Sequence, residues 1–481
     1  MAYNSLQEFV QVLEREGELK RIRYPVKPEL EVTEIADRVM KSGGPALLFE
    51  NVVGKNIPVL INAFGSAKRM ALALGVKDIE EIARDIEHLT RLKPPASLRD
   101  KLRMLPELLR LAGAAPKVIS GEGACQEVIE RDPDLNMLPV LTCWPGDAGP
   151  FITLPAVFSR DPRDGRRNVG LYRMQVFDAR TTGMHWHPHK VGARHFQRQK
   201  EATGRMELAA CLGGDPALIY AATAPLPDQI DELLFTGFLR KKAVKLVKAV
   251  TVDVEVPADA DIVIEGYIDP SEPLSVEGPF GDHTGFYSLA DRYPAFHVTC
   301  ITHRKNPIYL TTIVGRPPME DAFLGKATER IFLPLMRLTF PEIVDIDLPV
   351  HGVFHNLAIV SIKKEYPAQA RKIMHGLWGL GQMMFTKIIV VVDHDVDVHD
   401  PAEVAWIAGN HIDPKRDVVF VEGPVDVLDH AAPLMGYGSK MGIDATRKWP
   451  GEGFEREWPD AIVMDEKTKN YIDSIWPKLG I

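Results

Sequence analysis

The chain has few cysteines, and the four that it has are far apart in the sequence: Cys125, Cys143, Cys211 and Cys300. No two of them form a CxxC pair, which excludes the usual pattern of a structural zinc ribbon. A disulfide framework is not expected either, because such frameworks are typical of small secreted domains and this chain has 481 residues. We therefore expect free, buried thiols in a protein of the reducing cytoplasm.

Positive charge is not in excess either. The formal net charge is −9 at pH 7, and the longest basic runs, Arg166–Arg167 and Arg240–Lys242, are short. Proteins that bind nucleic acid usually carry a basic face, because phosphate contacts supply most of their affinity. The sequence therefore predicts no nucleic-acid partner.

Long apolar runs are missing as well. No stretch approaches the roughly 18 uninterrupted apolar residues that indicate a membrane span. The N-terminus leads into an acidic helical pattern rather than a cationic and apolar leader. We expect a soluble chain without a transmembrane segment. A soluble enzyme could still meet a lipid-linked substrate at a membrane surface.

Several common catalytic motifs do not occur. The chain contains no GxGxxG, no P-loop Gly-Lys-Ser/Thr, no GxSxG and no HExxH. Nucleotide hydrolysis, Rossmann-type dinucleotide binding and common hydrolase chemistry therefore lose their usual signatures.

The composition is that of an ordinary globular enzyme, with 45% hydrophobic and 26% charged residues among 481. That length predicts two to four compact units. The pattern divides into α/β (residues 1–115), a β-rich middle (116–315), α/β again (316–450), and a tail with a short helix (451–481). We expect the tail to contact another subunit.

Hydrophobic periodicity supports this division. Helical spacing is found around residues 6–13, 32–40, 79–89, 98–111, 228–240, 370–378, 401–408 and 466–476. Strand-like runs are found at residues 45–49, 57–62, 156–159, 169–177, 250–256, 261–268, 296–302, 387–392 and 418–421. Residues 304–307 resemble a hairpin turn, and Pro367 is expected at the first position of its helix.

The segment from Asn168 to Arg173 is the first candidate site. An asparagine oxygen can bind a hard cation, and an arginine can hold a carboxylate or phosphate through two parallel hydrogen bonds. On a regular strand the two side chains would point to opposite faces, but a bulge at Gly170 could redirect one of them. A strand-edge Asn and a surface Arg remain the simple alternative.

The segment His185-Trp-His-Pro-His189 is the second candidate. Alternate residues on a strand share a face, so three histidines suggest a metal site, and a zinc hydrolase built on them is one hypothesis. Pro188 makes three ligands from one straight strand doubtful.

Paired carboxylates form the third candidate. Glu277 and Asp282 flank a Gly-Pro-Phe-Gly turn, which would let both converge on one small volume. Acid–base catalysis uses such pairs when their environments separate their pKa values. A tight acidic surface turn is the alternative.

Two further positions are weaker on local evidence. Glu232 could bind a metal, whereas Asp228 could simply cap the helix that follows. Lys387, at the start of a buried strand, could meet a phosphate, although a strand-end lysine is usually solvated.

Taken together, five segments resemble the UbiD decarboxylase pattern in order and in spacing: Asn168–Arg173, Trp186-x-x-His189, Pro227–Glu232, Glu277–Asp282 and Phe385–Lys387. The resemblance runs from Leu6 to about Trp449. It implies an N-terminal α/β domain, a central split β-barrel like that of flavin reductases, and a C-terminal α/β domain. It also implies a homodimer or homohexamer.

The same resemblance implies a cofactor and its ligands. Prenylated FMN would come from a partner flavin prenyltransferase, and would be bound with a divalent ion, usually Mn²⁺, and often a nearby K⁺. The metal ligands would be Asn168, His189 and Glu232. The residues lining the cofactor would be Leu171, Tyr172, Arg173, His185, Trp186, His187, His189, Lys190, Val191 and Lys387.

Catalytic roles follow from the resemblance too. Arg173 would orient the substrate carboxylate, Asp282 would protonate the vacated carbon, and Glu277 would tune the charge of both. The flavin would accept the electrons left by CO₂. Apolar candidates near the site are Met319, Phe323, Leu324, Leu434 and Met435.

The leading hypothesis is therefore an aromatic acid decarboxylase of quinone biosynthesis, acting on a 4-hydroxy-3-polyprenylbenzoate or a hydroxynaphthoate. A degradative decarboxylase of small phenolic, furan or cinnamic acids is the second enzyme hypothesis. A flavin-binding assembly protein without chemistry is the alternative from another class, although a pure binder would have no need of a paired acid.

Overall fold

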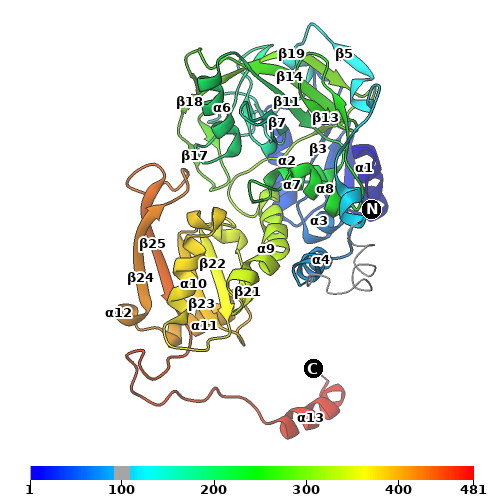
Figure 1. The fold of residues 1–481 in the computed structure, drawn as a ribbon. Helices are drawn as coiled ribbons and strands as arrows, with labels where there is room; N and C mark the ends of the chain where they lie inside the picture. The colour runs from blue at the N-terminus through cyan, green and yellow to red at the C-terminus, as the bar shows by residue number, and fades with distance from the viewer. Residues whose placement is uncertain (1, 92–108, 481) are drawn as a thin grey trace, which may run out of the picture.

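A computed structural model of the chain describes residues 2–91 and 109–480. Three α/β parts follow one another along the chain, and a C-terminal helix lies apart from them (Figure 1). The three-part fold predicted from the sequence is thus confirmed. The helix expected over residues 98–111 falls mostly outside the described residues. Among those residues, no helix combines the length and apolar character needed to cross a membrane.

The N-terminal part is a small sheet with amphipathic helices. Its elements are α1 (Leu6–Arg15), β1 (Leu19–Ile22), α2 (Glu31–Lys41), β2 (Ala46–Phe49), β3 (Val59–Ile61), α3 (Ala67–Ala73) and α4 (Glu80–Thr90). The sheet order is β1-β2-β3-β20, where β20 (Tyr309–Leu310) returns from the end of the central part. Residues 304–307 therefore connect two different sheets, and the expected hairpin was wrong.

The central part is built on a seven-stranded sheet in the order β10-β19-β14-β11-β7-β8, with β5 beside β19. All of its pairs are antiparallel. Its strands are β5 (Val128–Glu130), β7 (Ala156–Arg160), β8 (Arg167–Leu171), β10 (Thr181–Gly183), β11 (Met206–Leu212), β14 (Ile262–Ile268) and β19 (Ala295–His303). The helices are α6 (Val191–Ala202), α7 (Pro216–Thr223) and α8 (Glu232–Arg240).

Smaller two- and three-stranded sheets complete the central part and carry the site loops. They are formed by β4 (Lys117–Val118), β6 (Phe151–Ile152), β9 (Met174–Gln175), β12 (Lys245–Lys248), β13 (Glu255–Pro257), β15 (Ser275–Glu277), β16 (Phe280–Gly281), β17 (Tyr287–Ser288) and β18 (Asp291–Tyr293).

The C-terminal part has a five-stranded mixed sheet in the order β21-β22-β23-β25-β24. Its strands are β21 (Ile343–Asp347), β22 (Leu357–Ile362), β23 (Ile388–Asp393), β24 (Val418–Pro424) and β25 (Tyr437–Asp444). Its helices include α10 (Gln369–Trp378), α11 (Pro401–His411) and α12 (Pro414–Asp417). Helix α10 begins two residues after Pro367, so the expected first position was wrong.

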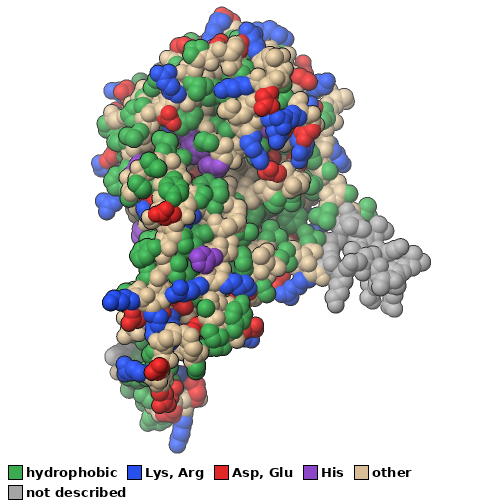
Figure 2. All heavy atoms as spheres, turned by 60° about the vertical axis from the view of Figure 1, so that its left-hand side comes forward, with side chains coloured by type: hydrophobic (Ala, Val, Ile, Leu, Met, Phe, Trp, Pro, Cys, Tyr) green, Lys and Arg blue, Asp and Glu red, His purple; other side chains and the backbone are tan. Residues whose placement is uncertain are grey.

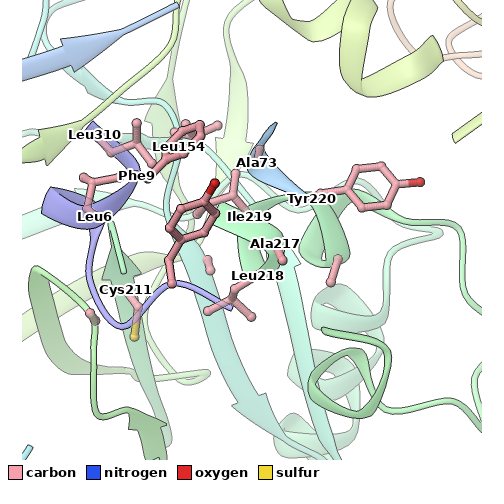
Figure 3. Packing of buried hydrophobic residues seen from close by; sticks show 14 of the residues in the cluster. Leu6, Phe9, Ala73, Leu154, Cys211, Ala217, Leu218, Ile219, Tyr220 and Leu310 are labelled. Atoms are coloured by element: carbon pink, nitrogen blue, oxygen red, sulfur yellow. The ribbon is translucent and has the colours of Figure 1, made fainter. Parts of the chain in front are cut away.

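The N-terminal and central parts share one hydrophobic core. Leu6 and Phe9 of α1 are fully buried in the same cluster as Ile219 and Tyr220 of α7 (Figure 3). All four cysteines are free and buried, as the sequence predicted. The first two parts therefore form one body.

Helix α9 (Glu320–Thr339) joins that body to the C-terminal part. Leu324 and Ile331 are buried in the shared core, whereas Leu333 and Met336 are buried in the core of the C-terminal sheet. The helix thus places the two bodies, and the site lies where they meet.

Candidate active site

Arg173 is the centre of a buried charge network. The strand expected over residues 169–177 is interrupted, because β8 pairs with β7 and β9 pairs with β6. Arg173 lies in the break between β8 and β9. Its guanidinium donates from Nε to Oε1 of Glu277 at 3.0 Å, from Nη1 to Oδ2 of Asp282, and from Nη2 to Oγ of Ser288 at 3.2 Å. The two carboxylates thus converge on one cation.

Burial makes this network strong. The side chains of Arg173, Glu277 and Asp282 are 11%, 0% and 7% exposed. Burial alone would raise the pKa of Asp282, but the charge of Arg173 and hydrogen bonds from His283 outweigh it and hold that pKa well below its usual range. Burial likewise opposes ionisation of Glu277, but His185 and Arg173 lower its pKa. Both carboxylates are therefore anionic in this state.

A backbone cradle sets the position of Asp282. The carboxylate of Asp147 accepts hydrogen bonds from the backbone nitrogens of Cys143, Trp144 and Gly281 at 2.7–3.1 Å. Gly281 lies against the Trp144 indole, where a Cβ atom would come within 2.2 Å of the ring. Only glycine therefore fits directly before Asp282.

Two of the three predicted histidines join this network. They lie in a loop after β10 rather than on a strand, in agreement with the doubt that Pro188 raised about three ligands from one straight strand. Nδ1 of His185 is 2.7 Å from Oε2 of Glu277, and its Nε2 is 2.7 Å from Nε2 of His187. The ring of His189 instead packs on Phe385, with ring centroids 4.6 Å apart. Among the described residues, these three do not form a cluster with metal-ligand spacing.

Asn168 and Glu232 meet at a second, charged pocket. Oε2 of Glu232 accepts a hydrogen bond from the backbone nitrogen of Val169 at 3.2 Å, which places it beside Asn168 on β8. Burial raises the pKa of Glu232 to about 7. The cavity of about 140 Å³ is lined by Asp161, Arg166, Arg167, Asn168, Val191, Arg194, His195, Arg198, Leu226, Pro227, Asp228, Gln229, Ile230, Asp231 and Glu232.

The cap predicted at Asp228 lies elsewhere. Asp231 caps α8 by accepting from the backbone nitrogens of Leu233 and Leu234, while Asp228 pairs with Arg194 at 2.8 Å. Capping by Asp231 starts the helix at Glu232, and so holds that carboxylate at the pocket.

Aromatic residues connect the pocket to the charge network. The buried hydroxyl of Tyr172 accepts from Nδ2 of Asn168 at 3.4 Å and from the backbone nitrogen of Gly192 at 3.3 Å. Its ring lies edge-on to Trp186 at 6.1 Å, and Nε1 of Trp186 is buried without a hydrogen-bond partner among the described residues. Gly170 pairs with Val157 in the regular register of β7 and β8, without a bulge, and packs against the Tyr172 ring.

The remaining predicted positions are more scattered. Lys190 precedes α6, and Leu171 packs on the shared core. Lys387 donates to Asp429 at 2.8 Å. Of the apolar candidates, Met319 and Leu324 are buried in cores and Phe323 packs against one, whereas Leu434 and Met435 are exposed.

Sequence reasoning missed residues that complete the network. Ser288 holds Arg173, and the ring of Tyr293 packs on His185 with centroids 4.3 Å apart. His283 donates to Asp282 and contacts His355 of the C-terminal part. The adjacency of His283 to Asp282 was a usable signal, but His355 had none. Figure 2 shows histidines on the face where the two bodies meet.

Family models match almost the whole described chain. The N-terminal, Rift-related and C-terminal domains of 3-octaprenyl-4-hydroxybenzoate carboxy-lyase (UbiD) match residues 10–86, 117–317 and 322–445. An uncharacterized protein of Archaeoglobus fulgidus is 53% identical over all 481 residues, which are 100% of this chain and 99% of that protein.

Solved structures agree. The UbiD-class enzyme HmfF of Pelotomaculum thermopropionicum, in complex with FMN, is 34% identical, with 95% of this chain and 97% of that chain covered and a TM-score of 0.79. Vanillic acid decarboxylase of Sedimentibacter hydroxybenzoicus in its closed form is 28% identical, with 100% and 99% covered and a TM-score of 0.86. The open form of the same enzyme matches this chain with a TM-score of 0.79.

Proposed function

Since this chain belongs to the UbiD family of prenylated-FMN-dependent decarboxylases, we propose that its Arg173 network removes the carboxylate of an aromatic or α,β-unsaturated acid as CO₂. The observation that carries the proposal is the buried guanidinium held between Glu277 and Asp282. A buried cation offers a strong site for a substrate carboxylate, and the adjacent carboxylates can hold and deliver a proton.

Each residue has a distinct role in this proposal. Arg173 binds the carboxylate and fixes the angle at which the C–C bond breaks. Asp282 donates the proton that the vacated carbon receives. Glu277 keeps Arg173 in place and, through His185, holds the neighbouring loop.

The residues of the site fit the predicted cofactor. Nε1 of Trp186 and two nitrogens of Arg167 are buried without hydrogen-bond partners among the described residues, and arginines line the pocket beside Asn168 and Glu232. The arginines suit a phosphate, and the side-chain oxygens of Asn168 and Glu232 suit a divalent cation. When bound, prenylated FMN supplies the acceptor for the electron pair that CO₂ leaves behind.

Asn168, His189 and Glu232 would hold Mn²⁺, which would anchor the flavin phosphate, and K⁺ would bind nearby. Leu171, Tyr172, His187, Lys190, Val191 and Lys387 would line the cofactor. His189 packs on Phe385 and is not among the residues that line the Asn168–Glu232 pocket, so its role as the third ligand is proposed from the family resemblance alone.

The substrate we favour is a 4-hydroxy-3-polyprenylbenzoate or a hydroxynaphthoate, as in quinone biosynthesis. Exposed apolar side chains support this substrate. Phe286 and Leu289, which follow Asp282 in the chain, and Met435 of the C-terminal part are all exposed. Such side chains suit a prenyl chain or a membrane surface. A small phenolic acid is the second candidate, supported by the similarity to vanillic acid decarboxylase.

The test is to co-express the chain with a flavin prenyltransferase, record the absorbance and mass of the bound cofactor, and assay CO₂ release. We expect prenylated FMN with Mn²⁺, and turnover of a prenylated hydroxybenzoate. Turnover of vanillate alone would favour the second candidate. Bound flavin without turnover of any acid in a phenolic, furan, cinnamic and naphthoic panel would favour the assembly-protein alternative.

A further inference from the structure

His283 and His355 link the acid network to the C-terminal part. Nδ1 of His283 lies 2.9 Å from Oδ1 of Asp282, and Nε2 of His283 lies 2.8 Å from Nε2 of His355. His283 follows β16 in the central part, whereas His355 precedes β22, 72 residues further along. The hydrogen bond between the two rings therefore exists only while the two bodies are in contact.

The backbone before His355 is held in an unusual conformation. Val353 and Phe354 both have positive φ, 56° and 43°, which is costly for side chains of these types. The ring of Phe354 packs on His283 with centroids 5.5 Å apart, and the side chain lies against Gly325 of α9, where an added Cβ atom would approach the Cβ atom of Phe354 to 2.8 Å. The backbone nitrogens of Val353 and Phe354 donate to the carbonyls of Val350 and Pro349, so the turn that directly precedes His355 is held by its own hydrogen bonds.

Charges around the two rings indicate how protons are arranged. Burial disfavours a charged His283, but the hydrogen bond and charge of Asp282 raise its pKa above the usual value. Burial and the charge of His283 lower the pKa of His355. The other charged groups that act on the pair are Asp321, Asp426 and Lys190. A charged His283 thus donates to Asp282 on one side and to a neutral His355 on the other.

Decarboxylation consumes a proton in every turnover, because R–CO₂⁻ and H⁺ give R–H and CO₂. Asp282 is anionic in this state and is held so by Arg173 and His283. A donor that starts each cycle ionised must be reloaded from a neighbour. Of the two groups bonded to Asp282, Arg173 keeps its proton under ordinary conditions, and only His283 can release one.

We propose that His283 and His355 form a proton relay that reloads Asp282 across the boundary between the two bodies, an inference that rests on the proposed role of Asp282. The Nδ1 proton of His283 first moves to Asp282, which leaves Asp282 protonated and His283 neutral. The C–C bond to the carboxylate then breaks with release of CO₂, and the vacated carbon takes the proton of Asp282 to form the C–H bond, which leaves Asp282 anionic again. His355 takes up one proton from the solvent and, once the rings have reoriented, passes it to His283, which restores the starting state.

Glutamine at position 355 separates proton transfer from structure. The His355→Gln side chain can still accept the hydrogen bond of His283, but it cannot carry a proton. We expect His355→Gln, loaded with prenylated FMN, to lose about tenfold to a hundredfold in kcat with little change in KM. Added imidazole should raise the rate of His355→Ala but not that of the unmodified enzyme. The control is His351→Ala, an exposed histidine four residues earlier.

The outcomes separate the relay from the function on which it rests. Full kcat in His355→Gln, or a loss in His355→Ala that imidazole does not reverse, overturns the relay. Asp282→Asn is assayed beside them with the same substrate. If Asp282→Asn is inactive while His355→Gln is fully active, only the relay fails. If Asp282→Asn turns over normally, the proposed function of the site fails first.

Discussion

Single residues in the site act mainly through the charge of Arg173. The sequence predicted that Glu277 and Asp282 could converge, because a glycine-rich turn separates them, and the structure brings both to one guanidinium. The sequence could not predict that the strand is interrupted at Arg173. The interruption arises because β8 and β9 pair with different strands, and local β-propensity carries no information about pairing partners.

The same limit applies to His355. No pattern within a few residues relates it to Asp282, since the contact depends on how two domains meet. Asn168 and Glu232 were predicted as metal ligands from the family resemblance, and the backbone hydrogen bond from Val169 to Glu232 shows that their distant segments lie together.

Replacement of Glu232 tests the metal proposal. The Glu232→Gln change removes a negative charge beside Asn168 while keeping the shape of the side chain. We expect Mn²⁺ affinity to fall at least about 10–100-fold, and flavin retention to fall with it. Metal analysis and flavin absorbance of the purified protein measure both. Glu201→Gln, an exposed α6 residue paired with Arg163, is the control, and equal metal content in both variants would contradict the assignment.

At the scale of helices and strands, most elements followed from hydrophobic periodicity, and the errors have physical causes. The strand expected over residues 250–256 is largely a turn, because the carboxylate of Glu265 takes the backbone nitrogens of Val250 and Thr251 at 2.9 and 2.6 Å. Side chains that bind backbone in this way compete with strand pairing. The hydrogen bond from Thr251 to Glu265 joins residues 14 positions apart, so it leaves no mark on the hydrophobic periodicity of the segment.

Strand β16 depends on a glycine that touches an indole. In Gly281→Ala the new Cβ atom would meet Trp144, and we expect destabilisation of about 1–3 kcal/mol together with loss of turnover as Asp282 shifts. Gly423→Ala in β24 meets nothing within 4 Å and serves as the control. Thermal unfolding of the two variants compares them, and equal Tm values would show that the Trp144 contact is not restrictive.

At the scale of the whole molecule, the C-terminal tail has two distinct parts. Trp458 packs on His411 with ring centroids 4.8 Å apart, so the tail adheres to its own domain up to that residue. Beyond it, Ile462 and Val463 are fully or largely exposed, and α13 (Glu466–Ile475) has no buried residue. Figure 1 shows this helix apart from the three parts of the fold. A ten-residue helix is marginal in isolation.

Removal of residues 461–481 therefore tests the predicted oligomer contact. We expect the full chain to form a homodimer or homohexamer in which α13 packs on another subunit, and the truncated chain to be smaller. Light scattering at matched concentration measures both masses. The full-length variant Lys467→Ala is a control for surface changes, and an unchanged mass after truncation would show that α13 makes no subunit contact.

The central claim is that Asp282 supplies the proton which replaces CO₂. The direct measurement is the rate of CO₂ release by Asp282→Asn, reconstituted with prenylated FMN and compared with the unmodified enzyme at equal flavin content. The account predicts that the variant binds the flavin but loses at least about 100-fold in turnover, because an amide cannot donate this proton. Turnover at the unmodified rate with full flavin content would contradict it.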